Sequence, residues 1–89
     1  MSRFLLSLTV NNHFGVLARV SGLFGRRGYN IASLSVGPLP GDESLSRMSI
    51  ETHTDAPGIQ QVIKQLRKLE DVKSVELIVE REPADLCQP

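Results

Sequence analysis

Residues 4–28, FLLSLTVNNHFGVLARVSGLFGRRG, carry the pattern of a strand, a turn and a helix in succession. Over residues 4–10 every second side chain is apolar, which is the period of a β-strand with one buried face. Residues 11–15 are turn-type, and residues 16–24 then place their apolar side chains on one helical face. Gly28 stands where a left-handed residue ends a helix. The stretch therefore predicts a strand and a helix that are joined by a short loop.

The remaining chain supplies three more strands and one more helix. The strands are expected at residues 31–36, 45–52 and 72–80. A loop is expected at residues 37–42, because its two prolines cannot donate hydrogen bonds to a sheet. Asp55-Ala56-Pro57 is a helix-start signature, and the amphipathic pattern that follows it ends near Lys68. In the last strand, Val75, Leu77 and Val79 are expected to form the apolar face.

The predicted order of elements is β-α-β-β-α-β. Each helix has a single apolar stripe, so both helices must cover the same face of one sheet. Right-handed crossovers then select an α+β ferredoxin-like sandwich, a four-stranded antiparallel sheet with two helices on one face. The domain is expected at residues 3–80, with residues 81–89 as a polar C-terminal tail. Gly22 and Gly25 inside the first helix suggest close packing against its backbone.

Composition argues against several classes of function. Ten basic and ten acidic side chains cancel, so no net field attracts nucleic acid or an anionic membrane surface. The single cysteine, Cys87, excludes an internal disulfide framework. No apolar run approaches the roughly 18–20 residues that span a bilayer, and the N-terminus does not read as a signal peptide. These features predict a cytoplasmic protein without a membrane or nucleic-acid partner.

Catalysis and metal binding have little support in the sequence. His13 and His53 lie in or near predicted loops and have no evident serine or cysteine partner. No cysteine or histidine spacing typical of a metal site occurs. We therefore expect neither a catalytic residue nor a metal ligand in this chain.

The loop between the first strand and the first helix is the best candidate for a binding site. The start of a helix presents unpaired N–H groups that suit a carboxylate or a phosphate. Gly15 allows a ligand to approach the backbone, and Asn12 offers both donors and acceptors. Asn and Gly are also ordinary turn residues, so the pattern alone fits a purely structural role of this loop as well as it fits ligand binding. The same two interpretations apply to Asn30, which follows the helix end.

Three longer stretches resemble a known family. Residues 8–20, LTVNNHFGVLARV, resemble the opening of an ACT domain, the amino-acid-sensing module of metabolic enzymes. Residues 22–34, GLFGRRGYNIASL, and residues 45–52, LSRMSIET, are similar to the small regulatory subunit of acetolactate synthase (acetohydroxyacid synthase, AHAS). The resemblance covers about residues 3–80. Phe14 departs from it, because relatives often carry proline or a small polar residue there.

This resemblance implies a non-catalytic chain that binds and activates a catalytic subunit. It also implies feedback inhibition by valine or another branched-chain amino acid. Thiamine diphosphate, Mg and FAD would belong to the catalytic subunit and not to this chain. The effector would lie between the two ACT domains of a homodimer. The implied ligand-binding residues are Asn12, Gly15, Val16 and Leu17 of one subunit, with Asn30 and Ile31 of the other. Val10, an apolar residue beside this site, favours an aliphatic ligand.

The predicted second strand bears on the homodimer. It is an unshielded sheet edge on which Ser33 and Ser35 alternate with small apolar residues. Such an edge favours pairing with a second copy into an eight-stranded sheet.

Two other functions remain open at the level of sequence. One is a free-standing ACT sensor that serves a different enzyme. The other is an acylphosphatase-like hydrolase, which shares the order of elements and uses the same loop for phosphate. That activity needs an arginine in the phosphate cradle. Arg19 is one turn into the helix and Arg26 lies at its far end, so neither is well placed.

Overall fold

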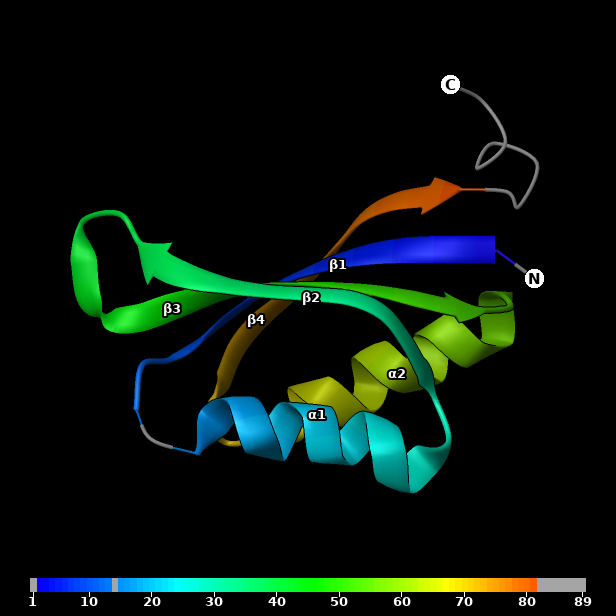
Figure 1. Cartoon of the computed structure of the whole chain (residues 1–89), viewed down its shortest axis with the longest axis horizontal. Coiled ribbons are helices and arrows are strands. Elements are labelled where there is room, and N and C mark those ends of the chain that lie inside the picture. Colours follow the sequence, from blue (N-terminus) through cyan, green and yellow to red (C-terminus); the bar gives the residue numbers. More distant parts are fainter. Residues whose placement is uncertain (1, 14, 82–89) are drawn as a thin grey trace.

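The computed structural model describes residues 2–13 and 15–81. Its elements are β1 (Ser2–Asn11), α1 (Val16–Arg27), β2 (Asn30–Leu39), β3 (Asp42–Thr54), α2 (Ala56–Arg67) and β4 (Val72–Arg81). Within the described residues the four strands form one antiparallel sheet in the order β2-β3-β1-β4, and both helices lie on one of its faces (Figure 1). The predicted ferredoxin-like βαββαβ sandwich is confirmed.

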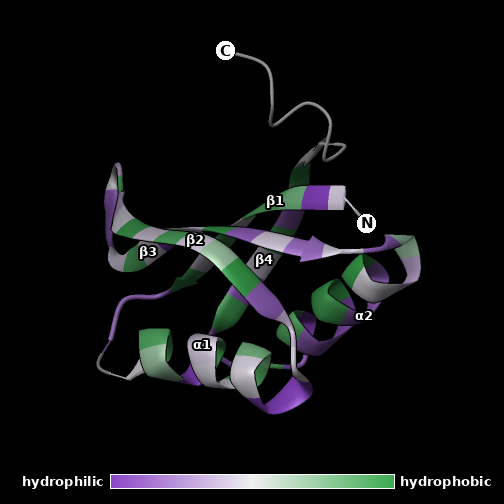
Figure 2. Ribbon diagram, turned by 45° about the vertical axis from the view of Figure 1, so that its right-hand side comes forward, coloured by the Kyte–Doolittle hydropathy of each residue, from purple (hydrophilic) through white to green (hydrophobic). Residues whose placement is uncertain are grey.

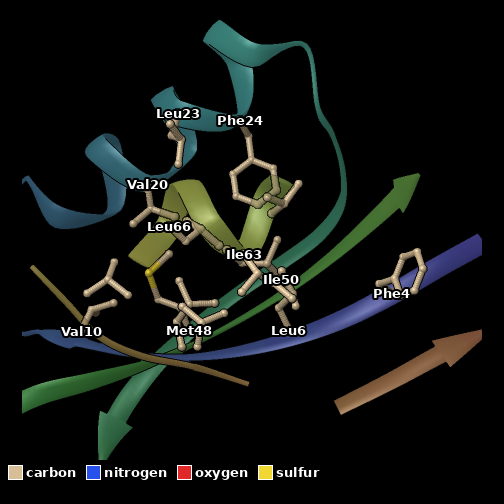
Figure 3. Packing of buried hydrophobic residues seen from close by; sticks show 14 of the residues in the cluster. Phe4, Leu6, Val10, Val20, Leu23, Phe24, Met48, Ile50, Ile63 and Leu66 are labelled. Carbon is tan, nitrogen blue, oxygen red and sulfur yellow. The ribbon is translucent and has the colours of Figure 1, made fainter. Parts of the chain in front are cut away.

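The core fills the space between the sheet and the two helices. Alternate residues of β1 are buried from Phe4 to Val10, as the period of two predicts. The helices contribute one stripe each, and Figure 3 shows these side chains reaching toward the sheet. The buried helix residues are Val16, Val20, Leu23 and Phe24 of α1 and Ile59, Val62, Ile63 and Leu66 of α2. This packing fixes where the first turn of α1 sits against the sheet.

Hydrophobic and hydrophilic positions alternate along both helices and most strands (Figure 2). This alternation is expected of elements that bury one face and leave the other in solvent. No helix in residues 2–13 and 15–81 is long and apolar enough to cross a membrane.

The hairpin between β2 and β3 is longer than the sequence predicts. The expected loop at residues 37–42 is wrong, because β2 continues to Leu39 and β3 begins at Asp42. Pro38 is tolerated because β2 is an edge strand, where a missing N–H interrupts no ladder on the outer side. The turn shrinks to Pro40 and Gly41, and Gly41 adopts a φ of 86°. The hairpin therefore extends beyond the start of α1 (Figure 1).

The expected apolar face of β4 is only partly correct. Val75 is buried, whereas Leu77 is 43% exposed, and the side chain of Val79 lies outside the described part of the chain. Two register shifts interrupt the pairing of β1 with β4, and such irregularities increase the local twist of a strand. β4 is also an edge strand whose last residues curve away from the helix layer (Figure 1), so Leu77 lacks a cover.

The packing expected around the glycines of α1 is absent from the described residues. A Cβ at Gly25 would meet nothing within 4 Å, and one at Gly22 would meet only the end of the Arg26 side chain, at 3.3 Å. The expectation of close backbone packing is therefore wrong within a single chain. β4 ends at Arg81, one residue beyond the expected domain boundary. Phe14 and residues 82–89, which include Cys87, lie outside the described residues.

Candidate functional site

The connection between β1 and α1 leads into a helix start, where the first N–H groups have no partner within the helix itself. Gly15 is the N-cap residue of α1, with a φ of 90° that other residues rarely adopt and with no side-chain cap hydrogen bond. The main-chain N–H of Val16 donates to the His13 carbonyl oxygen at 3.3 Å, and that of Arg19 donates to Gly15 at 2.9 Å. The N–H groups of Leu17 and Ala18 have no acceptor inside the helix. With the positive end of the helix dipole, they favour a bound carboxylate.

Asn12 is anchored to the β2–β3 hairpin. Its main-chain N–H donates to the Ser44 carbonyl oxygen at 2.8 Å, and its Nδ2 donates to the Glu43 carbonyl oxygen at 3.0 Å. These bonds hold the side chain at the end of β1 and leave Oδ1 as the atom that can accept a hydrogen bond from a ligand. An ammonium group is a fitting donor for that oxygen.

The hairpin turn that anchors Asn12 is itself organised by Asp42. The Asp42 Oδ1 accepts hydrogen bonds from the Ser44 hydroxyl at 2.6 Å and from the Ser44 main-chain N–H at 2.9 Å. These bonds stabilise the charged carboxylate, first through the hydroxyl and then through the main chain, and hold the pKa of Asp42 below its ordinary value.

A small pocket of about 120 Å³ lies beside this loop. It is lined by Val10, Asn11, Asn12, His13, Val16, Leu17, Val36, Ser46 and Met48. Polar groups from the loop meet an apolar wall there, formed by α1, β2 and β3. The sequence pattern places Leu17 on the apolar face of its helix. In the structure its side chain is 46% exposed and forms part of the apolar wall of the pocket. The lining suits a small zwitterion with an aliphatic side chain.

The structure separates the six expected ligand-binding residues into two groups. Asn12, Val16 and Leu17 line the pocket, and Gly15 adjoins it. Asn30 is paired with His53 and Ile31 with Thr52, at the other end of β2 and β3. α1 runs between the two groups, so they lie at opposite ends of a twelve-residue helix that is about 18 Å long at 1.5 Å per residue. A single chain does not bring them together.

Asp71 is a residue of this site that no sequence pattern marks. It lies in the turn between α2 and β4, and its side chain is 8% exposed. Its Oδ1 lies 3.1 Å from His13 Nε2 and accepts from Asn11 Nδ2 at 3.2 Å, while its Oδ2 pairs with Arg19 Nη1. His13, which has no evident serine or cysteine partner in the sequence, therefore lies beside the carboxylate of Asp71. The contacts join positions 52 to 60 residues apart, which no local spacing could reveal.

The ion pair of Arg19 with Asp71 also bears on the hydrolase alternative. An acylphosphatase-like site needs a free arginine in the phosphate cradle, whereas the guanidinium of Arg19 is engaged by a carboxylate. Arg26 lies in the last turn of α1, at the opposite end of the helix. The described residues thus offer neither arginine to a phosphate at this loop.

A larger concavity of about 360 Å³ lies elsewhere, along α2. Its walls come from α2 and the residue that follows it, and they are mostly long polar side chains such as Gln60, Lys64 and Arg67. This concavity is the solvent-facing side of a single helix. The smaller pocket joins several elements at the start of α1, and we consider it the better candidate site.

Comparisons with known proteins show the family to which this fold belongs. Residues 6–74 match the family model described as the AHAS small subunit-like ACT domain. The chain is 51% identical over 73 residues to the acetolactate synthase isozyme 3 small subunit of Escherichia coli K12, a match that covers 82% of this chain and 44% of that protein. It is 48% identical over 83 residues to a probable acetolactate synthase small subunit of Archaeoglobus fulgidus, covering 92% of this chain and 52% of that protein.

A solved structure is similar as well. The crystal structure of the acetolactate synthase small subunit from Thermotoga maritima superposes with a TM-score of 0.80 at 40% identity, over 86% of this chain and 47% of that one. The chain thus spans about half the length of the relatives that it matches. The matched residues include the second half of β1 from Leu6 onward, the loop to α1 and the start of β4. The chain belongs to the family of AHAS small subunit-like ACT domains.

Proposed function

We propose that this chain is a non-catalytic regulatory subunit of acetolactate synthase and that it binds a branched-chain amino acid, valine foremost. The observation that carries the proposal is the pocket beside Asn12, where helix N–H groups, a side-chain amide and an apolar wall meet. The amino acid's carboxylate would face the N–H groups of Leu17 and Ala18. Its ammonium would face Asn12 Oδ1, and its side chain would contact Val36 and Met48.

The proposed site is completed by a second copy of the chain. β2 is an outer strand of the described sheet, so its outward N–H and C=O groups can pair with another strand. Val36 and Leu34 on this strand are 49% and 37% exposed. Antiparallel pairing of two β2 strands about their middle would bring Asn30 and Ile31 of the partner subunit alongside the Val36 end. This homodimer joins the two groups of ligand-binding residues that one chain keeps apart.

Binding of the amino acid between the two subunits would then regulate the activity of the catalytic subunit. A ligand changes activity only if it has different affinities for two states of the complex. An amino acid that bridges Asn12 of one copy and Asn30 of the other would favour one arrangement of the pair. The catalytic subunit would sense that arrangement at its contact with this chain, and it would carry the thiamine diphosphate, Mg and FAD. A coupling of about 1–3 kcal/mol corresponds to a roughly 5–150-fold change in affinity.

Substitution of Asn12 tests this proposal. Asn12→Ala should weaken valine binding by about 1–3 kcal/mol, because the charged ammonium group of the ligand loses a hydrogen-bond partner. The fold should be retained, because the side chain is exposed and outside the core. Titration calorimetry with L-valine measures the affinity, and acetolactate formation by the chain reconstituted with its catalytic subunit measures inhibition.

Gln60→Ala is the matched control, since it removes an exposed amide from the outer face of α2. It should leave both valine affinity and inhibition unchanged. A wild-type chain that neither binds valine nor makes the reconstituted enzyme sensitive to a branched-chain amino acid would contradict the proposal. Normal valine binding by Asn12→Ala would show that the site lies elsewhere.

A further inference from the structure

Asp71 is the point where three parts of the chain meet beside the candidate pocket. Its main-chain carbonyl oxygen accepts from the Asn11 N–H at 2.8 Å, and its carboxylate accepts from the Asn11 side chain at 3.2 Å. The same carboxylate contacts His13 in the loop and Arg19 in the first turn of α1. Asp71 therefore holds the loop on both sides, at the last residue of β1 and at the start of the helix.

Among the described residues, few other side-chain contacts hold the loop to the helix. Gly15 provides no side-chain cap to α1, and the first turn of the helix contains no acidic residue. On the strand side, the Asn12 bonds to Glu43 and Ser44 connect the loop to the hairpin. A glycine at the N-cap gives the helix start none of the stabilisation that a capping side chain would provide. The contacts of Asp71 with His13 and Arg19 replace the missing cap as the restraint on the start of α1.

The burial of the Asp71 side chain strengthens its contacts with His13 and Arg19. The Asp71 side chain is 8% exposed, whereas those of His13 and Arg19 are 59% and 55% exposed. A carboxylate withdrawn from water forms stronger charge-assisted hydrogen bonds than an exposed one. Arg19 also neutralises a negative charge that would otherwise repel the carboxylate of a ligand at the adjoining N–H groups.

We propose that Asp71 is a positioning residue of the effector site, which holds the start of α1 in the geometry that receives the ligand's carboxylate. This inference rests on the proposed function, because it assigns Asp71 a role in binding the same amino acid. Asp71 does not touch the ligand. It acts through Asn11, His13 and Arg19, so its loss should misplace the N–H groups of Leu17 and Ala18 while the sheet stays intact.

The test uses Asp71→Asn, which keeps the shape of the side chain and removes its charge. Valine affinity, measured by calorimetry, should fall about tenfold or more, as expected for the loss of a charge-assisted contact. The matched control is Glu70→Gln, the same change at the exposed neighbouring residue, and it should bind valine as the wild type does. Adding Arg19→Met to Asp71→Asn should lower the affinity little further, because the two residues act as a unit.

A second readout needs no ligand. Amide hydrogen exchange should speed up in Asp71→Asn at Val16 and Arg19, whose N–H groups bond to loop carbonyls, while the amides of Leu6 and Ile50 keep their protection. Wild-type valine affinity in Asp71→Asn, or a uniform loss of protection over the whole sheet, would overturn the inference. If the wild-type chain fails to bind valine, the proposed function fails, and local exchange at Val16 and Arg19 still decides whether Asp71 positions this loop.

Discussion

Leu17 and Val36 are large aliphatic residues that stand about half exposed on either side of the candidate pocket. Single exposed aliphatic residues are common on protein surfaces and need no explanation. Here the two come from different elements and line one cavity together with the buried Met48. An apolar surface beside the N–H groups of a helix start is what an amino acid with an aliphatic side chain requires. At the scale of residues, the position of Leu17 thus favours ligand contact over a role in the core.

Gly25 offers a test of packing around α1 at the same scale. A Cβ there would meet nothing within 4 Å, and alanine is favoured over glycine inside a helix by about 1 kcal/mol. Gly25→Ala should therefore raise the Tm by about 4–8 °C, as measured by calorimetric or circular dichroism melting. Gly15→Ala serves as the contrast, because its φ of 90° strains alanine and should lower the Tm. A lower Tm in Gly25→Ala would mean that a neighbouring chain packs against this glycine.

At the scale of elements, the parts of the fold with a local period were predictable from the sequence. The strand at residues 4–10 alternates at every second position, and the stripe from Ile59 to Leu66 recurs every three to four residues. Asp55 was expected to begin α2, and its side chain accepts a hydrogen bond from the Gly58 N–H at 2.8 Å. Gly28 ends α1 in the left-handed conformation that its position predicts. Each of these signals lies within a few residues of the structure that it specifies.

The remaining features depend on which strand neighbours which. Most of the predicted loop at residues 37–42 is strand, because β2 lies at a sheet edge, where Pro38 costs little. The exposure of Leu77 follows from irregular pairing with β1, which no period records. Asn12 and Gly15 could be selected from the turn and helix-start pattern alone. Asp71 could not be selected, because only the antiparallel pairing of β1 with β4 brings it to the loop.

The β2–β3 hairpin should contribute stability that depends on pH through Asp42. Hydrogen bonds from Ser44 hold the pKa of Asp42 below its ordinary value of 3.8 in the folded chain. Because the folded pKa is the lower one, this contribution is fully present above 3.8 and is lost as the pH falls through the folded value. Urea unfolding at fixed protein concentration, over pH 2–6, should show wild type more stable than Asp42→Asn at pH 6 and the two converging at the acid end. A difference that does not change with pH would contradict this assignment.

At the scale of the whole molecule, the proposed ligand site requires two copies of the chain. The ligand-binding residues implied by the family resemblance fall at opposite ends of β2, and the exposed edge of that strand can join them. A dimer would have about twice the 9.8 kDa mass of the chain, which light scattering at micromolar concentration measures. An isologous pair has two equivalent sites, each with Asn12 from one copy and Asn30 from the other.

Mixing two variants tests this shared site most directly. Asn12→Ala and Asn30→Ala should each weaken valine binding at every site of their own dimers. After subunit exchange, about half of the dimers would be mixed, and each mixed dimer would have one site with both asparagines intact. Valine calorimetry should then recover about one tight site for every four chains. If the mixture binds valine no better than the separate variants do, or if Asn30→Ala alone binds it as tightly as the wild type, the site is not shared between two copies.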